Sequence, residues 1–378
     1  MFKIMFSVII CYFNALLAIL GNGLLILLIL HKSPRSMGNY KYLMLIFSTF
    51  GILFAIIDVT NQPMLHFHDG AYIIFSRNVL GLPRNISFCY IALNCSCYGM
   101  IMLLLVYHFV YRYLAVCKPH RLELFSYPYF NILIFIFLIV SAEWWISGVY
   151  AAGEDPEVED HIKQTMAENY GLSRLDYTYA SSLFYRTNFI TGEEYVSVRD
   201  FLFVASLAVQ IVSFSLDFRL YLRLLPIKFG HKYFRLRESI SGTGFSIIIY
   251  CWLKLRRELI RSARELQHIS RRTLEMQRQL FRSLVAQTLF PTFLMFIPAG
   301  ILLCFPILKT NMGPIEVILI PLITTQPFMD AIVPMYFIKA YRMAVLDFFG
   351  KKKGRSTLVS SLNDDRSGTN SRVFSLRH

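Results

Sequence analysis

The sequence predicts an all-α membrane protein, a bundle of seven transmembrane helices with the N-terminus outside the cell and the C-terminus inside. A helix needs about 20 mostly apolar residues to cross a bilayer. Connections between the apolar stretches alternate in charge, with 30 Lys and Arg residues on one side and 8 on the other. Because cytoplasmic connections accumulate Lys and Arg, the richer side faces the cytoplasm. The predicted spans are Ile4–Leu30, Tyr42–Leu65, Ser87–Tyr111, Leu124–Ala152, Phe201–Leu216, Ser283–Leu308 and Val317–Ile338.

The first four spans are long enough to cross the membrane. Few residues precede the first span, so we expect it to act as an uncleaved anchor and not as a signal peptide. The second and fourth spans each contain one acid toward the outer end, Asp58 and Glu143, and Trp144 and Trp145 follow the latter. Indole rings favour the membrane interface. We therefore expect both carboxylates to reach toward the outer surface and not toward a ligand.

The fifth span is short and is followed by a basic stretch. Phe201–Leu216 has only 16 residues, and Phe245–Leu253 reads like its missing inner end. Residues 217–244 contain six Lys and Arg residues, which cannot lie in hydrocarbon at about 2.5–3.5 kcal/mol per charge. Either the fifth helix is short and this stretch lies on the inner surface, or 217–244 is an insertion. We favour an insertion, because removing it restores a span of ordinary length.

Composition and spacing exclude several classes of function. The net charge is +14, but the excess lies in short connections beside the membrane, where it meets anionic lipid, so we expect no nucleic-acid partner. The seven Cys residues lack zinc-ligand spacing. The spans contain no paired acids, metal-ligand set or nucleophile motif, so we expect no enzyme activity, metal or cofactor. Because residues 154–200 contain no Cys, a disulfide cannot tie the third helix to this outer connection.

The outer connections carry two further features. Residues 154–200 hold ten acids and four bases, and they form either a lid over a pocket or a solvated surface. Asn85 begins an Asn-Ile-Ser acceptor sequence in the first outer connection, so it is a candidate for glycosylation.

Four motifs lie in order on matching spans. Ser36–Met44 opens the second span, His108–Val116 closes the third, Met276–Leu284 opens the sixth and Ile338–Arg342 closes the seventh. Together they resemble the nematode seven-transmembrane chemoreceptors of the Str type, and the resemblance covers nearly the whole chain. It implies a G-protein-coupled receptor of the plasma membrane, in the cilium of chemosensory neurons. Such a receptor detects an odorant or another small chemical cue and activates a heterotrimeric G protein.

The resemblance assigns G-protein coupling to Tyr111, Arg112 and Tyr113 at the inner end of the third span. A guanidinium is always charged and offers planar donors, so Arg112 can exchange an internal partner for the C-terminal helix of a G-protein α-subunit. The residue before it is Tyr111 in place of an acid, so the usual local salt bridge is missing and the resting partner must differ. The alternative is an Arg that only anchors the helix at the inner interface.

The resemblance also implies a polar network that rearranges on activation. Asp330 in the seventh span matches the family's acid, although the family usually has Asp-Pro where this chain has Asp330-Ala331, with Pro334 following. Pro291 and Pro298 in the sixth span supply kinks where that helix can pivot. The alternative for Asp330 is a protonated packing residue.

A ligand pocket is expected between the outer halves of the spans. Tyr90, Asn94 and Tyr98 share one face of the third helix, where they could offer an aromatic wall and one hydrogen-bonding group to a small, mostly apolar ligand. Plain packing between helices explains them equally well.

The chain is expected to form a receptor domain, residues 1–349, and a cytoplasmic tail, residues 350–378, that we predict to be disordered. Lys351–Lys353 favour anionic membrane lipid. The Ser and Thr hydroxyls of the tail could accept phosphate and recruit a desensitising partner, or the tail could be an ordinary unstructured segment. A ligand-gated ion channel or a small-solute transporter is the alternative function. However, the spans show neither a polar pore face nor several mid-membrane charges.

Overall fold

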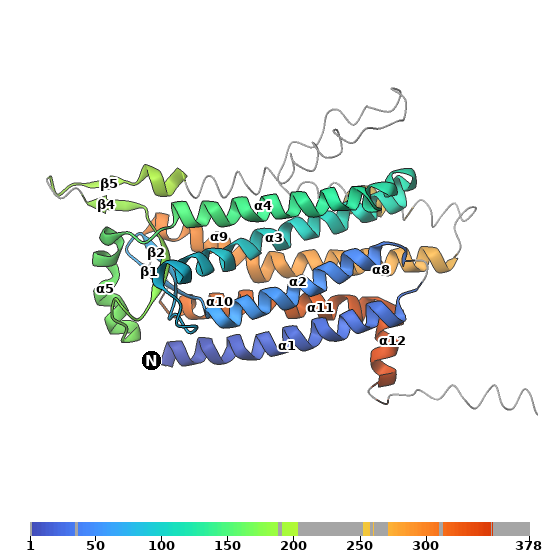
Figure 1. The fold of residues 1–378 in the computed structure, drawn as a ribbon, viewed down its shortest axis with the longest axis horizontal. Helices are drawn as coiled ribbons and strands as arrows, with labels where there is room; N and C mark the ends of the chain where they lie inside the picture. The colour runs from blue at the N-terminus through green and yellow to red at the C-terminus, as the bar shows by residue number, and fades with distance from the viewer. Residues whose placement is uncertain are drawn as a thin grey trace, which may run out of the picture.

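The computed structural model describes residues 2–34, 37–187, 191–202, 252–257, 260, 271–309, 313–348 and 350. Most of the predicted fifth span, the stretch 217–244 and the tail after Gly350 lie outside the described residues. Figure 1 shows an elongated helix bundle. Strands and one short helix cover the end at which the N-terminus lies, and α12 lies at the opposite end.

Within the described residues, four helices are long and apolar enough to cross a membrane. In α3, 67% of the most apolar window is buried, whereas in α4 the share is 11%. The third span is therefore central in the bundle, and the fourth lies at its edge, where its apolar side chains meet lipid. The four helices are α1 (Phe2–Lys32), α2 (Tyr40–Asn61), α3 (Arg84–Cys117) and α4 (Tyr129–Ala151).

The sixth span changes its winding midway. It consists of α8 (Arg271–Pro291), a π-helical turn (Thr292–Phe296) and α9 (Ile297–Cys304). Proline lacks a backbone N–H, and its ring clashes with the carbonyl four residues earlier. The wider turn contains Leu294, four residues before Pro298, so it relieves the conflict that Pro298 would cause. Wide turns of this kind are frequent where a helix bends for function.

The seventh span is broken into two helices. α10 (Glu316–Thr324) and α11 (Gln326–Phe337) meet at a bend of 40°. Ile338 then has an extended backbone, and α12 (Lys339–Phe348) turns away from the bundle (Figure 1).

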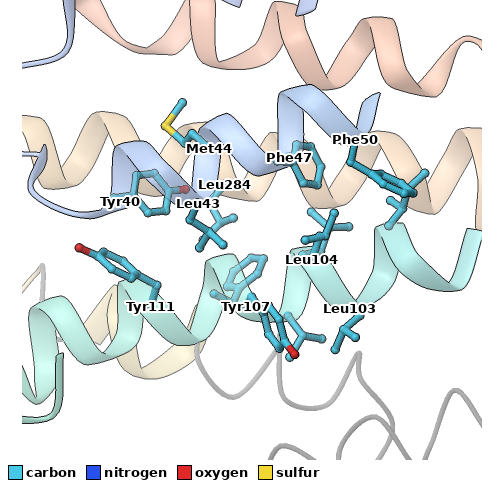
Figure 2. Close-up of a cluster of buried hydrophobic side chains, with 14 of the residues drawn as sticks. Tyr40, Leu43, Met44, Phe47, Phe50, Leu103, Leu104, Tyr107, Tyr111 and Leu284 are labelled. Atoms are coloured by element: carbon cyan, nitrogen blue, oxygen red, sulfur yellow. The ribbon is translucent and has the colours of Figure 1, made fainter. Parts of the chain in front are cut away.

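Close packing of α2 on α3 forms the centre of the bundle. Figure 2 shows Leu43 and Phe47 of α2 beside Leu104 of α3, and each is at most 5% exposed. Lipid tails are as apolar as these side chains, so the contact is stabilised by van der Waals packing more than by exclusion of water. The Tyr107 hydroxyl donates to the Leu133 carbonyl of α4 at 3.0 Å, which links α3 to its other neighbour.

The outer connections fold into one structure, called here the outer cap, made of β1, β2, β3 and α5. Its three strands are antiparallel, in the order β1-β2-β3, so a strand of the long connection extends the hairpin of the first one. A separate pair, β4 with β5, follows. The elements are β1 (Met64–His68), β2 (Ala71–Ser76), α5 (Pro156–Tyr170), β3 (Thr178–Leu183), β4 (Tyr185–Thr187) and β5 (Glu194–Val196).

Local sequence explains α5 well. Asp155 accepts a hydrogen bond from the Glu157 N–H at 3.0 Å and caps the helix, and Pro156 fills the first helical position. Gly171 ends the helix with φ 67°, a left-handed conformation that glycine adopts without strain. Apolar residues spaced by four form its buried face, which packs on the sheet, and they are Val158, Ile162, Met166 and Tyr170.

Two predicted span boundaries are wrong. The second helix ends at Asn61, and Met64 and Leu65 belong to β1 because they pair with β2. The fourth begins at Tyr129, after a 3₁₀ turn over Pro119–Phe125. In both places an apolar run continues past the helix end, so hydropathy alone cannot locate the boundary. Residues 154–200 are more than a solvated surface, since α5 and β3 share a buried core with β1 and β2. That they form a lid over a pocket stays a prediction.

Arg186 joins the outer cap to the start of the fifth span. Its guanidinium lies 2.9 Å from Asp155, 2.6 Å from Glu157 and 3.2 Å from Asp200. Burial alone would raise the pKa of the Asp155 carboxyl, but hydrogen bonds from Arg186 and from the Glu157 backbone hold that pKa below its ordinary value. The carboxylate is therefore fully charged at neutral pH.

Replacing Arg186 with glutamine is expected to leave these three carboxylates facing one another, with only the exposed Arg199, 3.7 Å from Asp155, as a cation. We expect a loss of about 1.5–3 kcal/mol, the range for hydrogen bonds to charged groups, and faster amide hydrogen exchange in α5. Arg174→Gln is the matched control, because Arg174 is 42% exposed and exposed ion pairs contribute about 0–1 kcal/mol. Equal losses in the two variants would contradict this prediction.

Candidate functional site at the inner end of the third helix

Arg112 lies in the last turns of α3, and its side chain is only 2% exposed. Its guanidinium carbon lies 3.5 Å from the centre of the Tyr40 ring of α2. Its Nη1 donates to Oε1 of Gln277 in α8 at 3.0 Å. The resting partner of this Arg is therefore an aromatic ring and an amide, which together connect the second, third and sixth spans.

Neighbouring rings hold Tyr40 in place. The Tyr40 hydroxyl lies 2.9 Å from Nδ1 of His108. The Tyr111 ring lies 5.3 Å from the Tyr40 ring and 5.0 Å from the Phe125 ring, and Figure 2 shows the two tyrosines facing each other between α2 and α3. Tyr111 thus supports the partner of the adjacent Arg and belongs to the site, whereas Tyr113 is half-buried at the edge of the same core.

The hydrogen bonds of Arg112 are incomplete. Nε and Nη2 are buried and have no hydrogen-bond partner among the described residues. A desolvated cation over an aromatic face gains about 2 kcal/mol, and one hydrogen bond to a charged group about 1.5–3 kcal/mol. The guanidinium therefore keeps donors available for another acceptor. Among the described residues, it makes a single hydrogen bond to α8, to the side-chain amide of Gln277.

Tyr40 and Gln277 were not among the predicted site residues. Each lies within one of the motifs that resemble the Str chemoreceptors, Ser36–Met44 and Met276–Leu284. That membership was the available signal, but no spacing rule relates residues so far apart in the chain.

Asp330 lies in a polar cluster in the middle of the bundle. It is 4% exposed, and Nε2 of Gln326 donates to its Oδ1 at 2.7 Å. Gln287 of α8 reaches the Asp330 carbonyl at 3.4 Å, and Asn22 of α1 donates to the Pro327 carbonyl at 2.9 Å. These bonds join the first, sixth and seventh spans at the level of the predicted activation network.

The candidate prolines lie at or near changes in helix direction. Pro291 precedes the π-helical turn, and Pro298 is buried at the second position of α9. Pro334 is buried inside α11, one turn before the helix ends, and its carbonyl accepts the Ile338 N–H at 3.0 Å. Their positions fit pivots in the sixth and seventh spans.

The three candidate ligand residues of α3 contact α2. The Tyr90 and Asn94 side chains bond to α2 side chains, and Tyr98 makes an edge contact with an α2 ring. These contacts supply packing between two helices. The pairs are Tyr90 with Thr60 at 2.5 Å, Asn94 with Asp58 at 3.2 Å, and Tyr98 with Phe54 at 5.4 Å between ring centres.

The expectation that Asp58 reaches the outer surface is wrong. Asp58 is 4% exposed and accepts a hydrogen bond from Asn94. A short side chain on the inward face of a helix cannot extend around it to the interface, and here an amide donor already meets it. Glu143, by contrast, is exposed on α4. Asn85, the glycosylation candidate, is exposed in the first turn of α3.

The described part of the chain contains no group of three or more His, Cys, Asp or Glu residues placed to hold a metal ion. Cys11, Cys89, Cys95 and Cys97 are free thiols.

Comparison with known proteins gives one consistent family. The family model described as serpentine type 7TM GPCR chemoreceptor Str matches residues 7–219 and 236–346. The chain is 25% identical to serpentine receptor class r-10 of Caenorhabditis elegans over 350 residues, which cover 92% of this chain and 90% of that receptor. The Caenorhabditis briggsae protein of the same name is also 25% identical, with the same coverage. G-protein coupled receptor str-33 of C. elegans is 20% identical over 342 residues, 89% of each chain.

Proposed function

Because this chain belongs to the Str family of serpentine seven-transmembrane chemoreceptors and is a G-protein-coupled receptor of the membrane, we propose that it detects a small molecule outside the cell. Binding on the outer half then activates a heterotrimeric G protein at the inner end. We further propose that the molecule is an odorant or similar cue, and that the receptor acts in the plasma membrane of the cilium of a chemosensory neuron. The family is one of receptors, not of enzymes.

The observation that carries the coupling proposal is the contact of Arg112 with α8. Activation in this architecture moves the inner end of the sixth span outward. That motion would break the 3.0 Å bond between Arg112 and Gln277 and open a path to the guanidinium. Its buried donors can then bind the C-terminal helix of a G-protein α-subunit.

The change in helical winding after Pro291 supports this motion. The π-helical turn that follows is a natural pivot between the inner α8 and the outer α9. The hydrogen bond from Gln287 of α8 to the Asp330 carbonyl of α11 lies on the inner side of the pivot. We propose that this bond changes partners as α8 moves.

Replacing Gln277 with leucine removes the hydrogen bond that holds α8 to Arg112. Because about 1.4 kcal/mol is a tenfold change in a two-state equilibrium and the bond is worth about 1.5–3 kcal/mol, we expect basal signalling to rise at least about tenfold. Basal G-protein activation in a heterologous cell, normalised to surface expression, measures this. Gln164→Leu, the same substitution on the exposed face of α5, is the control. Unchanged basal activity in the Gln277 variant would refute the proposed contact.

Asn94 tests the ligand side of the proposal. Asn94→Leu leaves the buried Asp58 carboxylate without its amide donor, at a cost of about 1–3 kcal/mol. We expect the ligand dose-response to weaken more than surface expression does. Ser141→Ala, which removes a single hydroxyl of α4 outside the candidate pocket, is the control. An unchanged dose-response in the Asn94 variant would exclude a role in ligand response.

The remaining proposals concern the chain ends and the inner surface. We propose that residues 1–349 form the receptor domain and that residues 350–378 form a tail whose basic cluster meets lipid and whose phosphorylated hydroxyls recruit a desensitising partner. We also propose that 217–244 is an insertion, because the gap between the two segments matched by the family model falls within it.

A further inference from the structure

Glu316, the first residue of α10, is a buried carboxylate in the outer part of the molecule. It is 4% exposed, and groups from three other elements surround it. Oε1 lies 3.2 Å from the Lys3 ammonium of α1 and accepts from the Tyr170 hydroxyl of α5 at 3.1 Å. Oε2 accepts from the Phe67 N–H of β1 at 3.2 Å and lies 3.4 Å from Nδ1 of His66.

Lys3 differs from the other partners of Glu316. Tyr170 and His66 are at most 5% exposed and the Phe67 N–H belongs to the sheet backbone, whereas the Lys3 side chain is 31% exposed. Burial, strengthened by the adjacent Glu316 carboxylate, raises the pKa of Tyr170, so its hydroxyl remains a donor at all ordinary pH values. Among the described partners, only the ammonium can exchange with solvent without unfolding the outer cap.

The surroundings of the Lys3 ammonium form an ammonium-binding set. Besides the carboxylate at 3.2 Å, the Asn169 Oδ1 accepts from it at 3.3 Å, and the Tyr170 ring centre lies 5.6 Å away. A carboxylate, an amide oxygen and an aromatic face all attract a cation and offer nothing to an anion.

A small cavity of about 10 Å³, enough for about one water molecule, adjoins this set. The Lys3 side chain lines it, so displacing that side chain enlarges it. Its other walls are mostly apolar and would accept a short alkyl chain. The remaining lining residues are Ser7, Met64, Leu65, Tyr170, Glu316, Val317 and Ile320.

We propose that the space left when the Lys3 side chain moves out to solvent, between α1, β1, α5 and α10, binds a small primary alkylammonium ion, and that the Lys3 ammonium occupies this place in the unliganded receptor. A free alkylammonium ion has the same charge and the same three N–H donors as the Lys3 ammonium, and its alkyl chain can follow the path of the Lys3 side chain. Lys3 competes as a tethered ligand at an effective concentration of about millimolar. The inference adds a ligand class to the proposed receptor function, yet it concerns binding alone and can fail while G-protein coupling persists.

Calorimetric titration of the purified full-length receptor in phosphatidylcholine nanodiscs tests this site, with n-butylammonium as the probe. We expect the Lys3→Ala variant to bind n-butylammonium at least tenfold more tightly than the unmodified receptor. 1-Butanol and butyrate, which have the same chain without the cation, should show no such gain. Without any substitution, n-butylammonium should raise the melting temperature more than an equal concentration of 1-butanol.

Lys309→Ala is the matched control, because Lys309 pairs with Glu194 at 2.5 Å and lies over the Tyr185 ring, but its acid is 58% exposed. An equal gain in this control, an equal effect of 1-butanol, or no gain in Lys3→Ala would overturn the proposal. Phosphatidylethanolamine carries the same primary ammonium in its headgroup. If adding it to the nanodisc abolishes n-butylammonium binding, a lipid is the occupant and the assignment to a free amine is wrong.

Discussion

Replacing Arg112 with leucine is expected to abolish ligand-evoked G-protein activation while the receptor still reaches the cell surface. The guanidinium is the group that we propose to exchange the Tyr40 ring and Gln277 for the G protein, and leucine offers neither charge nor donors. Leucine fills part of the same space against apolar neighbours, so folding should suffer less than signalling. We expect at least a tenfold loss of maximal response after normalisation to surface expression.

Two control variants distinguish a specific role of Arg112 in G-protein coupling from the general effect of a positive charge at the inner surface. Arg112→Lys keeps the charge but loses the planar donors, so we expect a partial response. Arg121→Leu removes a cation from the same inner surface, in the 3₁₀ turn after α3, and should leave most of the response. A full response in the Arg112→Leu receptor would show that Arg112 is only a membrane anchor.

Replacing Glu316 with leucine is expected to have the largest effect on stability. The substitution removes the carboxylate that accepts from the Phe67 N–H and pairs with the Lys3 ammonium. Lys3 keeps only the Asn169 Oδ1, and the Tyr170 hydroxyl keeps only the Leu65 carbonyl as acceptor. Removing one member of a buried charged cluster typically costs about 3–5 kcal/mol. We expect a clear drop in the melting temperature and faster amide exchange in β1 and α5, because this carboxylate joins both to the seventh span.

Glu316→Gln keeps one acceptor oxygen in the same shape and should lose less stability. Glu194→Leu removes the acid of an exposed pair with Lys309, for which about 0–1 kcal/mol is typical. A Glu316→Leu receptor as stable as the Glu194→Leu receptor would mean that the carboxylate does not hold the outer cap to the bundle.

The sequence predicted the family and the fold class well, but it predicted the residues of the sites only in part. The receptor family and the seven-transmembrane fold class were confirmed, whereas the coupling role of Arg112 stays a prediction. The sequence did not identify Tyr40, Gln277 or Glu316 as members of sites. Each was an ordinary residue near a span end, and its importance comes from a contact with a distant segment.

Asp58 shows why the remaining details were out of reach. Its position near the end of an apolar run favoured an interfacial carboxylate, yet it faces Asn94 inside the bundle. The same holds for the outer cap, in which β2 and β3 pair although about 100 residues separate them. The pattern of apolar residues within one segment does not tell which other segment that segment will contact, or with which face.

The sequence by itself determined the class, the number of spans and their orientation, because bilayer thickness and the distribution of Lys and Arg act on each segment separately. Only the tertiary structure decided what Arg112 binds at rest, that Asp58 points inward, and that Lys3 and Glu316 meet at the outer end. These contacts depend on how separate helices rotate and pack against one another. That packing depends on all the helices together, so it cannot be predicted from any one segment.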